Sequence, residues 1–155
     1  MIREDPQNKC LFLKFEAAQT IDDVFFNGIH LGQHIGGYSA FTFEVTEHVK
    51  VNEINEVRVE VDNTYNDSVI PIAGDFIIYG GLTRPVSIII TNKISTTPLN
   101  YTSPGVYITQ KLVTEEKAEV SILTKVANQY ESVKDISIKV RIFDELDIKI
   151  LKEES

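Results

Sequence analysis

Hydrophobic and polar residues alternate with a period of two along most of this chain. The cleanest run covers residues 136–142, where Ile and Val alternate with Ser137, Lys139 and Arg141. A period of two is typical of antiparallel strands with one buried face. Further alternating runs cover residues 11–16, 41–45, 57–62 and 120–125, and residues 86–90 predict a strand because they are nearly all β-branched. Only residues 46–51 suggest a helical turn, so the sequence predicts an all-β chain.

Glycine-containing turns separate the predicted strands. Asn27-Gly28 stands between apolar runs and predicts a β-hairpin, because a type I′ turn needs positive φ at both central residues. Gly36-Gly37, Gly80-Gly81 and Pro104-Gly105 predict further bends. Short strands joined by such turns are typical of β-sandwiches.

A domain boundary is expected near residue 93. The apolar run 86–91 ends there, and the following stretch NKISTTPL is polar and contains proline. We therefore expect one unit over residues 1–93 and a second over residues 94–155. Each unit has fewer predicted strands than a complete β-sandwich. A jelly roll has about eight strands, and an immunoglobulin-like sandwich has about seven.

Composition excludes several functions. The formal net charge of −8 argues against binding to nucleic acid, which needs a basic surface, and against docking on anionic membranes. The single cysteine, Cys10, rules out an internal disulfide. The polar start MIREDPQNK lacks the apolar core of a signal peptide, and no apolar run is long enough for a membrane span. The compartment stays open.

The stretch VFFNGIHLGQHIGGYSAFTFEVT, residues 24–46, resembles a known family. It is similar to the sugar-binding domain of glycoside hydrolase family 2, the β-galactosidase group. There an aromatic-x-Asn-Gly turn precedes a Gly-x-His-x-Gly-Gly-Tyr bend and a Phe-x-Phe strand. The matching positions are Asn27, Gly28, Gly32, His34, Gly36, Gly37, Tyr38, Phe41 and Phe43.

A second block, residues 71–88, resembles the Asp-Phe-x-x-Tyr-Gly-Gly-x-x-Arg-x-Val signature of the same family. Its matches are Asp75, Phe76, Tyr79, Gly80, Gly81, Arg84 and Val86. The resemblance implies a galactose-binding-like jelly-roll sandwich, short at its N-terminal side, followed by a partial immunoglobulin-like sandwich. The version Gly-Leu-x-Arg-Pro-Val is shared with β-glucuronidases, so the substrate class stays open.

The resemblance implies that Asp75 contacts sugar hydroxyls, since a carboxylate accepts two hydrogen bonds from vicinal hydroxyls. The residues alone favour a turn acid, because Gly74-Asp75 is ordinary turn chemistry, and only the surrounding motif brings the sugar contact level with it. Tyr79 either lines the pocket or is a core tyrosine with a bonded hydroxyl. Arg84 is expected to pair with Asp75 or with an acid across the domain boundary.

The other motif residues suggest structural roles. Gly80-Gly81 predicts a backbone bend, and Asn63 is expected to end the strand before it by bonding its own backbone. His34 is expected to brace its loop. His30 and His34 lie four residues apart without a helical pattern, so we expect no metal site. No motif for a cofactor is present.

Glycoside hydrolysis needs two carboxylates set roughly 5–10 Å apart. The family takes them from a (β/α)₈ barrel of about 250 residues, which this sequence does not contain. We therefore predict a non-catalytic, sugar-binding or scaffold portion of such an enzyme, with the barrel and a galactoside-like carbohydrate as partners. The alternatives are a stand-alone carbohydrate-binding module and a structural interaction domain, which would form homo-oligomers through exposed strand edges.

Overall fold

The structure, a computed structural model, describes residues 8–69, 77 and 79–143. These residues form β-strands and one short 3₁₀ helix, η2 (Thr46–His48), without an α-helix. None of them forms a helix of the length and apolarity that a membrane crossing requires. The strands are β1 (Lys9–Phe15), β2 (Ala18–Gln19), β3 (Ile21–Phe26), β4 (Ile29–Ile35), β5 (Phe41–Glu44), β6 (Val57–Asp62), β7 (Gly81–Leu82), β8 (Val86–Asn92), β9 (Ile94–Thr96), β10 (Val106–Val113), β11 (Ala118–Thr124) and β12 (Val126–Asn128).

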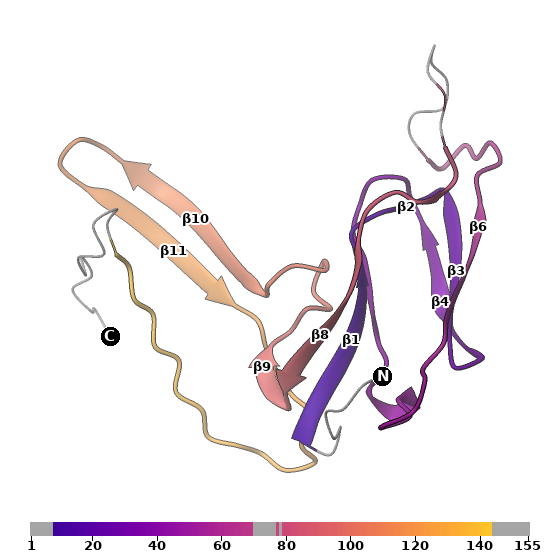
Figure 1. Cartoon of the computed structure of the whole chain (residues 1–155). Helices are drawn as coiled ribbons and strands as arrows, with labels where there is room; N and C mark the ends of the chain where they lie inside the picture. The colour runs from indigo at the N-terminus through magenta and orange to yellow at the C-terminus, as the bar shows by residue number, and fades with distance from the viewer. Residues whose placement is uncertain (1–7, 70–76, 78, 144–155) are drawn as a thin grey trace.

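Two three-stranded antiparallel sheets face each other as a β-sandwich (Figure 1). One has the order β5-β1-β8 and the other β4-β3-β6. In the first sheet Phe15 of β1 stands opposite Phe41 on one side and Val86 on the other. In the second, β3 lies between its two partners. The predicted all-β sandwich is confirmed.

The core fills the space between β1 and β3. Leu11, Leu13 and Phe15 of β1 are buried together with Val24 and Phe26 of β3. The alternation in each strand explains this, because successive side chains point to opposite faces of a sheet. Burial of a side chain of this size stabilises the fold by about 1.5–3 kcal/mol. The free thiol of Cys10 is also buried in β1.

The predicted hairpin is present between β3 and β4. Asn27 and Gly28 have φ of 50° and 84°, the positive values that a type I′ turn requires. The Asn27 side chain also organises the loop before β6. Its Nδ2 donates to the backbone oxygen of His48 at 2.7 Å and to Asn55 Oδ1 at 2.8 Å, and its Oδ1 accepts from the backbone of Glu56 at 3.0 Å.

The chain after β8 forms two antiparallel pairs, β9 with β12 and the hairpin β10–β11. The strand predicted over residues 136–142 is wrong, because the structure contains no strand there. Alternation creates an apolar face, but a strand also needs a neighbouring strand edge for its backbone. The described chain places none beside this segment. The division at residues 93 and 94 stays a prediction.

Asp22 breaks the apolar pattern of the core. It lies on the inward face of β3, opposite His34 in β4 and Val61 in β6. Its side chain is fully buried, and neither carboxylate oxygen has a hydrogen-bond partner among the described residues. Burial, followed by the nearby charge of Asp23, raises the pKa of Asp22 to about 6. A buried carboxyl without partners is more stable when it is protonated.

Asp22 should make the protein less stable as the pH rises. Its pKa increases from 3.8 in the unfolded chain to about 6 in the fold, so the folded state holds the proton more tightly. The free energy of unfolding should fall between pH 4 and pH 7, by about 3 kcal/mol from this group. Asp22→Asn should remove that fall, as measured by urea unfolding at several pH values. Asp135→Asn, at an exposed carboxyl, is the control, and an equal slope in wild type and Asp22→Asn would refute the assignment.

Asn27→Ala should lower the free energy of unfolding by about 2–4 kcal/mol, because it removes three hydrogen bonds and places alanine at positive φ. Asn52→Ala is a matched control, since Asn52 has φ 59° but its side chain bonds no described residue. That control isolates the loss of unfolding free energy that results from placing alanine at positive φ, which is expected to be about 1 kcal/mol. Equal losses in the two variants, measured by chemical denaturation, would contradict the proposed role of the Asn27 side chain.

Candidate functional site

The two motif blocks meet at one end of the sandwich, where β2 lies in Figure 1. The short stretch between β1 and β3 contacts both blocks, and Thr20 in it contacts the first. The backbone oxygen of Thr20 accepts from the backbone of Gly36 at 2.9 Å, and its backbone nitrogen donates to Asp62 at 3.1 Å. In the other block, β7 pairs with β2, with Gly81 opposite Gln19. The stretch between β1 and β3 therefore holds both motifs in place.

Two glycines of the motifs allow close packing at this end. A Cβ on Gly37 would lie 3.0 Å from Gln19 Nε2, and a Cβ on Gly80 would lie 2.8 Å from Cβ and Cγ of Asn63. Gly81 has φ of 114°, which side-chain-bearing residues rarely adopt. Glycine at these positions brings the loop after β6 against β7.

Exposed tyrosines project from the same end. Tyr38 follows β4, Tyr65 follows β6 and Tyr79 precedes β7, and more than half of each side chain is exposed. The interpretation of Tyr79 as a core residue is wrong, since it is 72% exposed. The stretch around it pairs with β2 only from Gly81 onward, so Tyr79 stands outside the sheet. Tyr65 lies in neither motif, so the sequence analysis missed it.

His34 supports the glycine bend from the end of β4. Its ring stacks on Phe41 with 4.0 Å between ring centroids, and its Nε2 lies 3.4 Å from Ser39 Oγ. Burial lowers the pKa of His34, so the ring is neutral at pH 7. This placement agrees with a bracing role. No group of three potential metal ligands occurs in the described chain.

In the turn after β6, the residue that ends the strand is not the one we expected. Asp62, rather than Asn63, bonds its own backbone, since its Oδ1 accepts from the backbone nitrogen of Thr64 at 2.8 Å. Hydrogen bonds from Thr64 lower the pKa of the Asp62 carboxyl. Asn63 instead packs against Gly80. The preceding aspartate, rather than Asn63, therefore ends the strand, and the structural role of Asn63 stays a prediction.

Asp75 lies outside the described residues, so its sugar contact stays a prediction. Arg84 is exposed and forms no ion pair with another residue in the described part of the chain. Its pairing with Asp75 therefore also stays a prediction. Neighbouring residues fix the backbone at this point, because Thr83 donates to the backbone oxygen of Ala17 at 3.3 Å.

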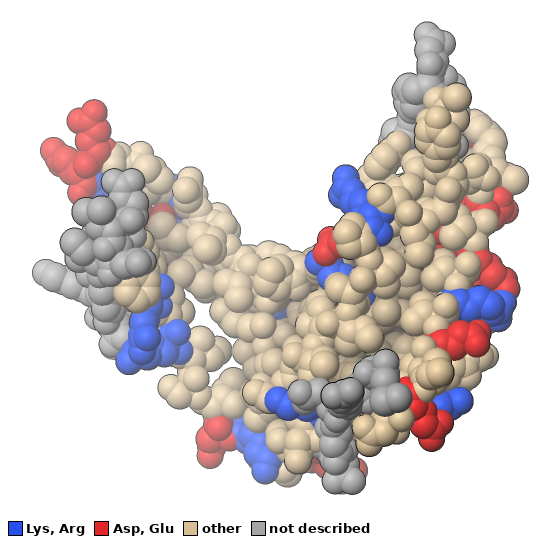
Figure 2. All heavy atoms as spheres, in the orientation of Figure 1, with Lys and Arg blue, Asp and Glu red and all other residues tan. Residues whose placement is uncertain are grey.

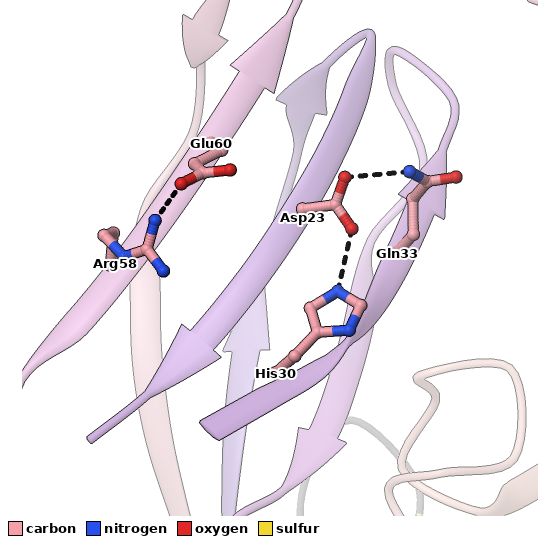
Figure 3. Close-up of polar contacts among 5 residues, drawn as sticks. All are labelled: Asp23, His30, Gln33, Arg58 and Glu60. Carbon is pink, nitrogen blue, oxygen red and sulfur yellow. Dashed lines mark hydrogen bonds and ion pairs between the residues drawn. The ribbon is translucent and has the colours of Figure 1, made fainter. Parts of the chain in front are cut away.

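A polar cluster on the outer face of the β4-β3-β6 sheet escaped the sequence analysis (Figure 3). Asp23 accepts hydrogen bonds from His30 Nε2 and Gln33 Nε2, each at 2.8 Å. These bonds, from Gln33 first and then His30, lower the pKa of Asp23. The period of two could have placed these side chains on one face, but it could not give their cross-strand register.

On the same face Arg58 pairs with Glu60, and its guanidinium carbon lies 3.8 Å from the centre of the Phe25 ring. The His30 ring packs near Phe25 as well, with 4.8 Å between centroids. Figure 2 shows acidic and basic side chains interleaved along the side that β6 forms. Their charged groups bind one another, so this face resembles a solvated surface more than a ligand site.

Comparisons with known proteins agree with the motif resemblance. No family model matches the chain. A β-glucuronidase of Bacteroides fragilis is 42% identical over 83% of the chain, which corresponds to 18% of that protein. The crystal structure of Bacteroides uniformis β-glucuronidase aligns with a TM-score of 0.77 and 31% identity, over 83% of this chain and 15% of the other.

A solved β-glucuronidase from glycoside hydrolase family 2 aligns with a TM-score of 0.69 and 28% identity. That alignment covers 83% of this chain and 15% of the enzyme. The chain thus spans less than a fifth of the length of these relatives. Both the sequence and the fold place it in the N-terminal part of such enzymes. The chain therefore belongs to the family 2 glycoside hydrolases, as a partial domain of these larger proteins.

Proposed function

We propose that the chain is a scaffold beside a catalytic domain, and that its tyrosine-bearing end forms one wall of a sugar subsite. The observation that carries this proposal is the meeting of both family motifs at that end, on residues 17–20. Backbone hydrogen bonds hold the first block through Gly36 and Thr20, and the second through Thr83 and Ala17. A fixed wall can orient a substrate without losing much conformational entropy on binding.

The residues at this end suit a carbohydrate. Tyrosine combines an apolar ring, which can cover the apolar face of a sugar, with a hydroxyl that forms hydrogen bonds. Tyr38 and Tyr79 offer such rings to solvent. Asp75 precedes Tyr79 by four residues, and its carboxylate would accept hydrogen bonds from two neighbouring sugar hydroxyls.

Catalysis is assigned to the catalytic domain, because the described acids do not form a suitable pair. Asp22 and Asp23 are adjacent, but they point to opposite faces of β3. Asp22 is buried in the core, and Asp23 is bonded to its neighbours. Glu115 and Glu116 lie at the tip of the β10–β11 hairpin, exposed to solvent. A general acid and a nucleophile must instead flank one bond.

The names of the relatives support a substrate class. Those that match the chain carry the names β-glucuronidase and β-galactosidase. We therefore extend the proposal to β-glucuronides as well as the β-galactosides that the sequence resemblance implied. The two sugars differ at carbon 6, where one has a carboxylate and the other a hydroxymethyl group, and in the configuration of the hydroxyl at carbon 4. Both β-pyranosides carry axial hydrogens at carbons 1, 3 and 5 on one ring face, so both can present that apolar face to a tyrosine.

The isolated chain should not hydrolyse nitrophenyl β-galactoside or nitrophenyl β-glucuronide, because its described residues hold no carboxylate pair that could flank a scissile bond. Release of nitrophenol at the rate of a buffer blank is the expected result. Turnover above that blank that disappears when an acid of this chain is mutated would overturn the assignment of catalysis to the barrel.

The sugar-facing end is tested with methyl β-galactoside and methyl β-glucuronide in ¹H–¹⁵N NMR titrations. We expect weak, millimolar binding with shifts confined to residues 36–38 and 79–82. Tyr79→Ala and Asp75→Ala should abolish these shifts, while Tyr101→Ala, at an 89% exposed tyrosine in the chain after β8, should not. Shifts elsewhere, or none with either sugar, would contradict the sugar wall.

A further inference from the structure

The hairpin of β3 and β4 contains a β-bulge. Val24 stands opposite Gly32, but its neighbour Phe25 already stands opposite His30. Leu31 is therefore an extra residue of β4 that has no partner in β3. A bulge interrupts the alternation of faces, so each residue of β4 beyond it points to the face opposite to the one that a regular strand would give it.

Side-chain contacts show the same interruption. Leu31 packs against the hydrophobic core, on the inner face of the sheet. The next residue, Gly32, also faces the core, because a Cβ on it would lie 2.9 Å from Cε1 of Phe43, another residue packed there. Two consecutive residues of a regular strand cannot point to one face. The bulge is thus visible in the packing as well as in the backbone pairing.

The bulge decides on which face His34 lies. The two-residue turn fixes the start of β4, so in a regular strand His34 would stand opposite Ile21, on the outer face. In the bulged strand it stands opposite the buried Asp22, and its ring stacks on Phe41. There the ring fills the space beside Gly36, where a Cβ would lie 3.0 Å from His34 Nε2. The glycine bend therefore rests on a histidine that only the bulge turns inward.

The carboxylate of Asp23 bonds residues on both sides of the bulge (Figure 3). Its Oδ1 accepts from His30 Nε2 and its Oδ2 from Gln33 Nε2, each at 2.8 Å. His30 and Gln33 lie three positions apart, so in a regular strand their side chains would point to opposite faces. One carboxylate could not then reach both of them. The pair of hydrogen bonds is compatible only with the bulged register.

We infer that Asp23 selects the bulged register of β4 and is thereby a positioning residue for the tyrosine-bearing end. Its effect passes through the bulge to His34, and from His34 to the bend that carries Tyr38. Every contact in this chain of effects lies within residues 20–43. The register assignment stands on these contacts alone, whereas the effect on sugar binding rests on the proposed function.

Asp23→Ala removes both hydrogen bonds and should let β4 slip into a regular strand. Cross-strand nuclear Overhauser effects (NOEs) should then join Val24 to Leu31 instead of Gly32. His34 should also leave the core, so its pKa, which burial lowers, should rise toward the ordinary histidine value in an NMR titration of the ring. Wild-type NOEs together with an unchanged His34 pKa would overturn the inference.

Glu60→Ala is the matched control. Glu60 stands opposite Asp23 on the other side of β3, and its carboxylate pairs with Arg58 of its own strand. This variant loses a carboxylate from the same face without touching the bulge, so it should keep the wild-type NOEs and the wild-type pKa of His34. The same changes in both variants would reveal a general effect of lost charge and would contradict a specific role of Asp23.

Deletion of Leu31 separates the register from general stability. Without the extra residue β4 is a regular strand, and its remaining residues meet their present partners in β3 without a clamp. Asp23→Ala should therefore leave the NOEs and the His34 pKa unchanged in this background. If Asp23→Ala alone fails to fold, the deletion should restore its folding. A raised His34 pKa in the combined variant, or unfolding in both backgrounds, would refute the inference.

The effect on the site is measured by ¹H–¹⁵N NMR titration with methyl β-glucuronide. Asp23→Ala should bind the sugar at least about tenfold more weakly, because the slipped strand no longer supports Tyr38. Glu60→Ala should bind it like the wild type. Equal affinity of Asp23→Ala and wild type would refute the positioning role. No binding by the wild type would overturn the proposed function and the positioning role with it, while the NOEs judge the register separately.

Discussion

The two-sided role of β1 is the constraint on which the rest of this structure depends. Its inner face supplies three of the largest fully buried side chains, Leu11, Leu13 and Phe15, to the core. Its edges pair with β5 on one side and β8 on the other. The chain then continues directly into β2 and Thr20, which hold the two motif blocks. The position of the candidate site is therefore set by core packing, since the same stretch of chain serves both.

The sequence predicted the parts of the fold that local rules determine. Alternation located β1 and β6, a β-branched run located β8, and Asn27-Gly28 located the hairpin, because these signals depend only on neighbouring residues. The strand over residues 136–142 failed for the same reason. Its side-chain pattern is as regular as that of β6, yet pairing depends on a partner edge that the pattern does not encode.

At the candidate site, the sequence located the two motif blocks correctly, but it predicted the roles of their individual residues less well. The motifs indicated Asn63, Tyr79 and Gly80, and the structure brings Asn63 and Gly80 into contact. It does not bury Tyr79, and Asp62 has the turn-forming bond expected for Asn63. Burial and hydrogen-bond partners follow from tertiary packing, so a linear motif cannot specify them. Tyr65 carried no sequence signal at all, because an exposed tyrosine in a polar loop has no pattern.

The bulge in β4 connects the buried Asp22 with the candidate site. A regular β4 would place Gln33 opposite Asp22 on the inner face, where its amide could donate a hydrogen bond to the carboxylate. The bulged register places His34 there instead, and both carboxylate oxygens of Asp22 stay without a partner among the described residues. Buried polar groups are usually hydrogen-bonded, so the bulged register is the less favourable one for Asp22. Departures from such local rules are expected at functional sites. The unpartnered carboxyl beside the glycine bend thus points to the same end of the sandwich as the two motifs.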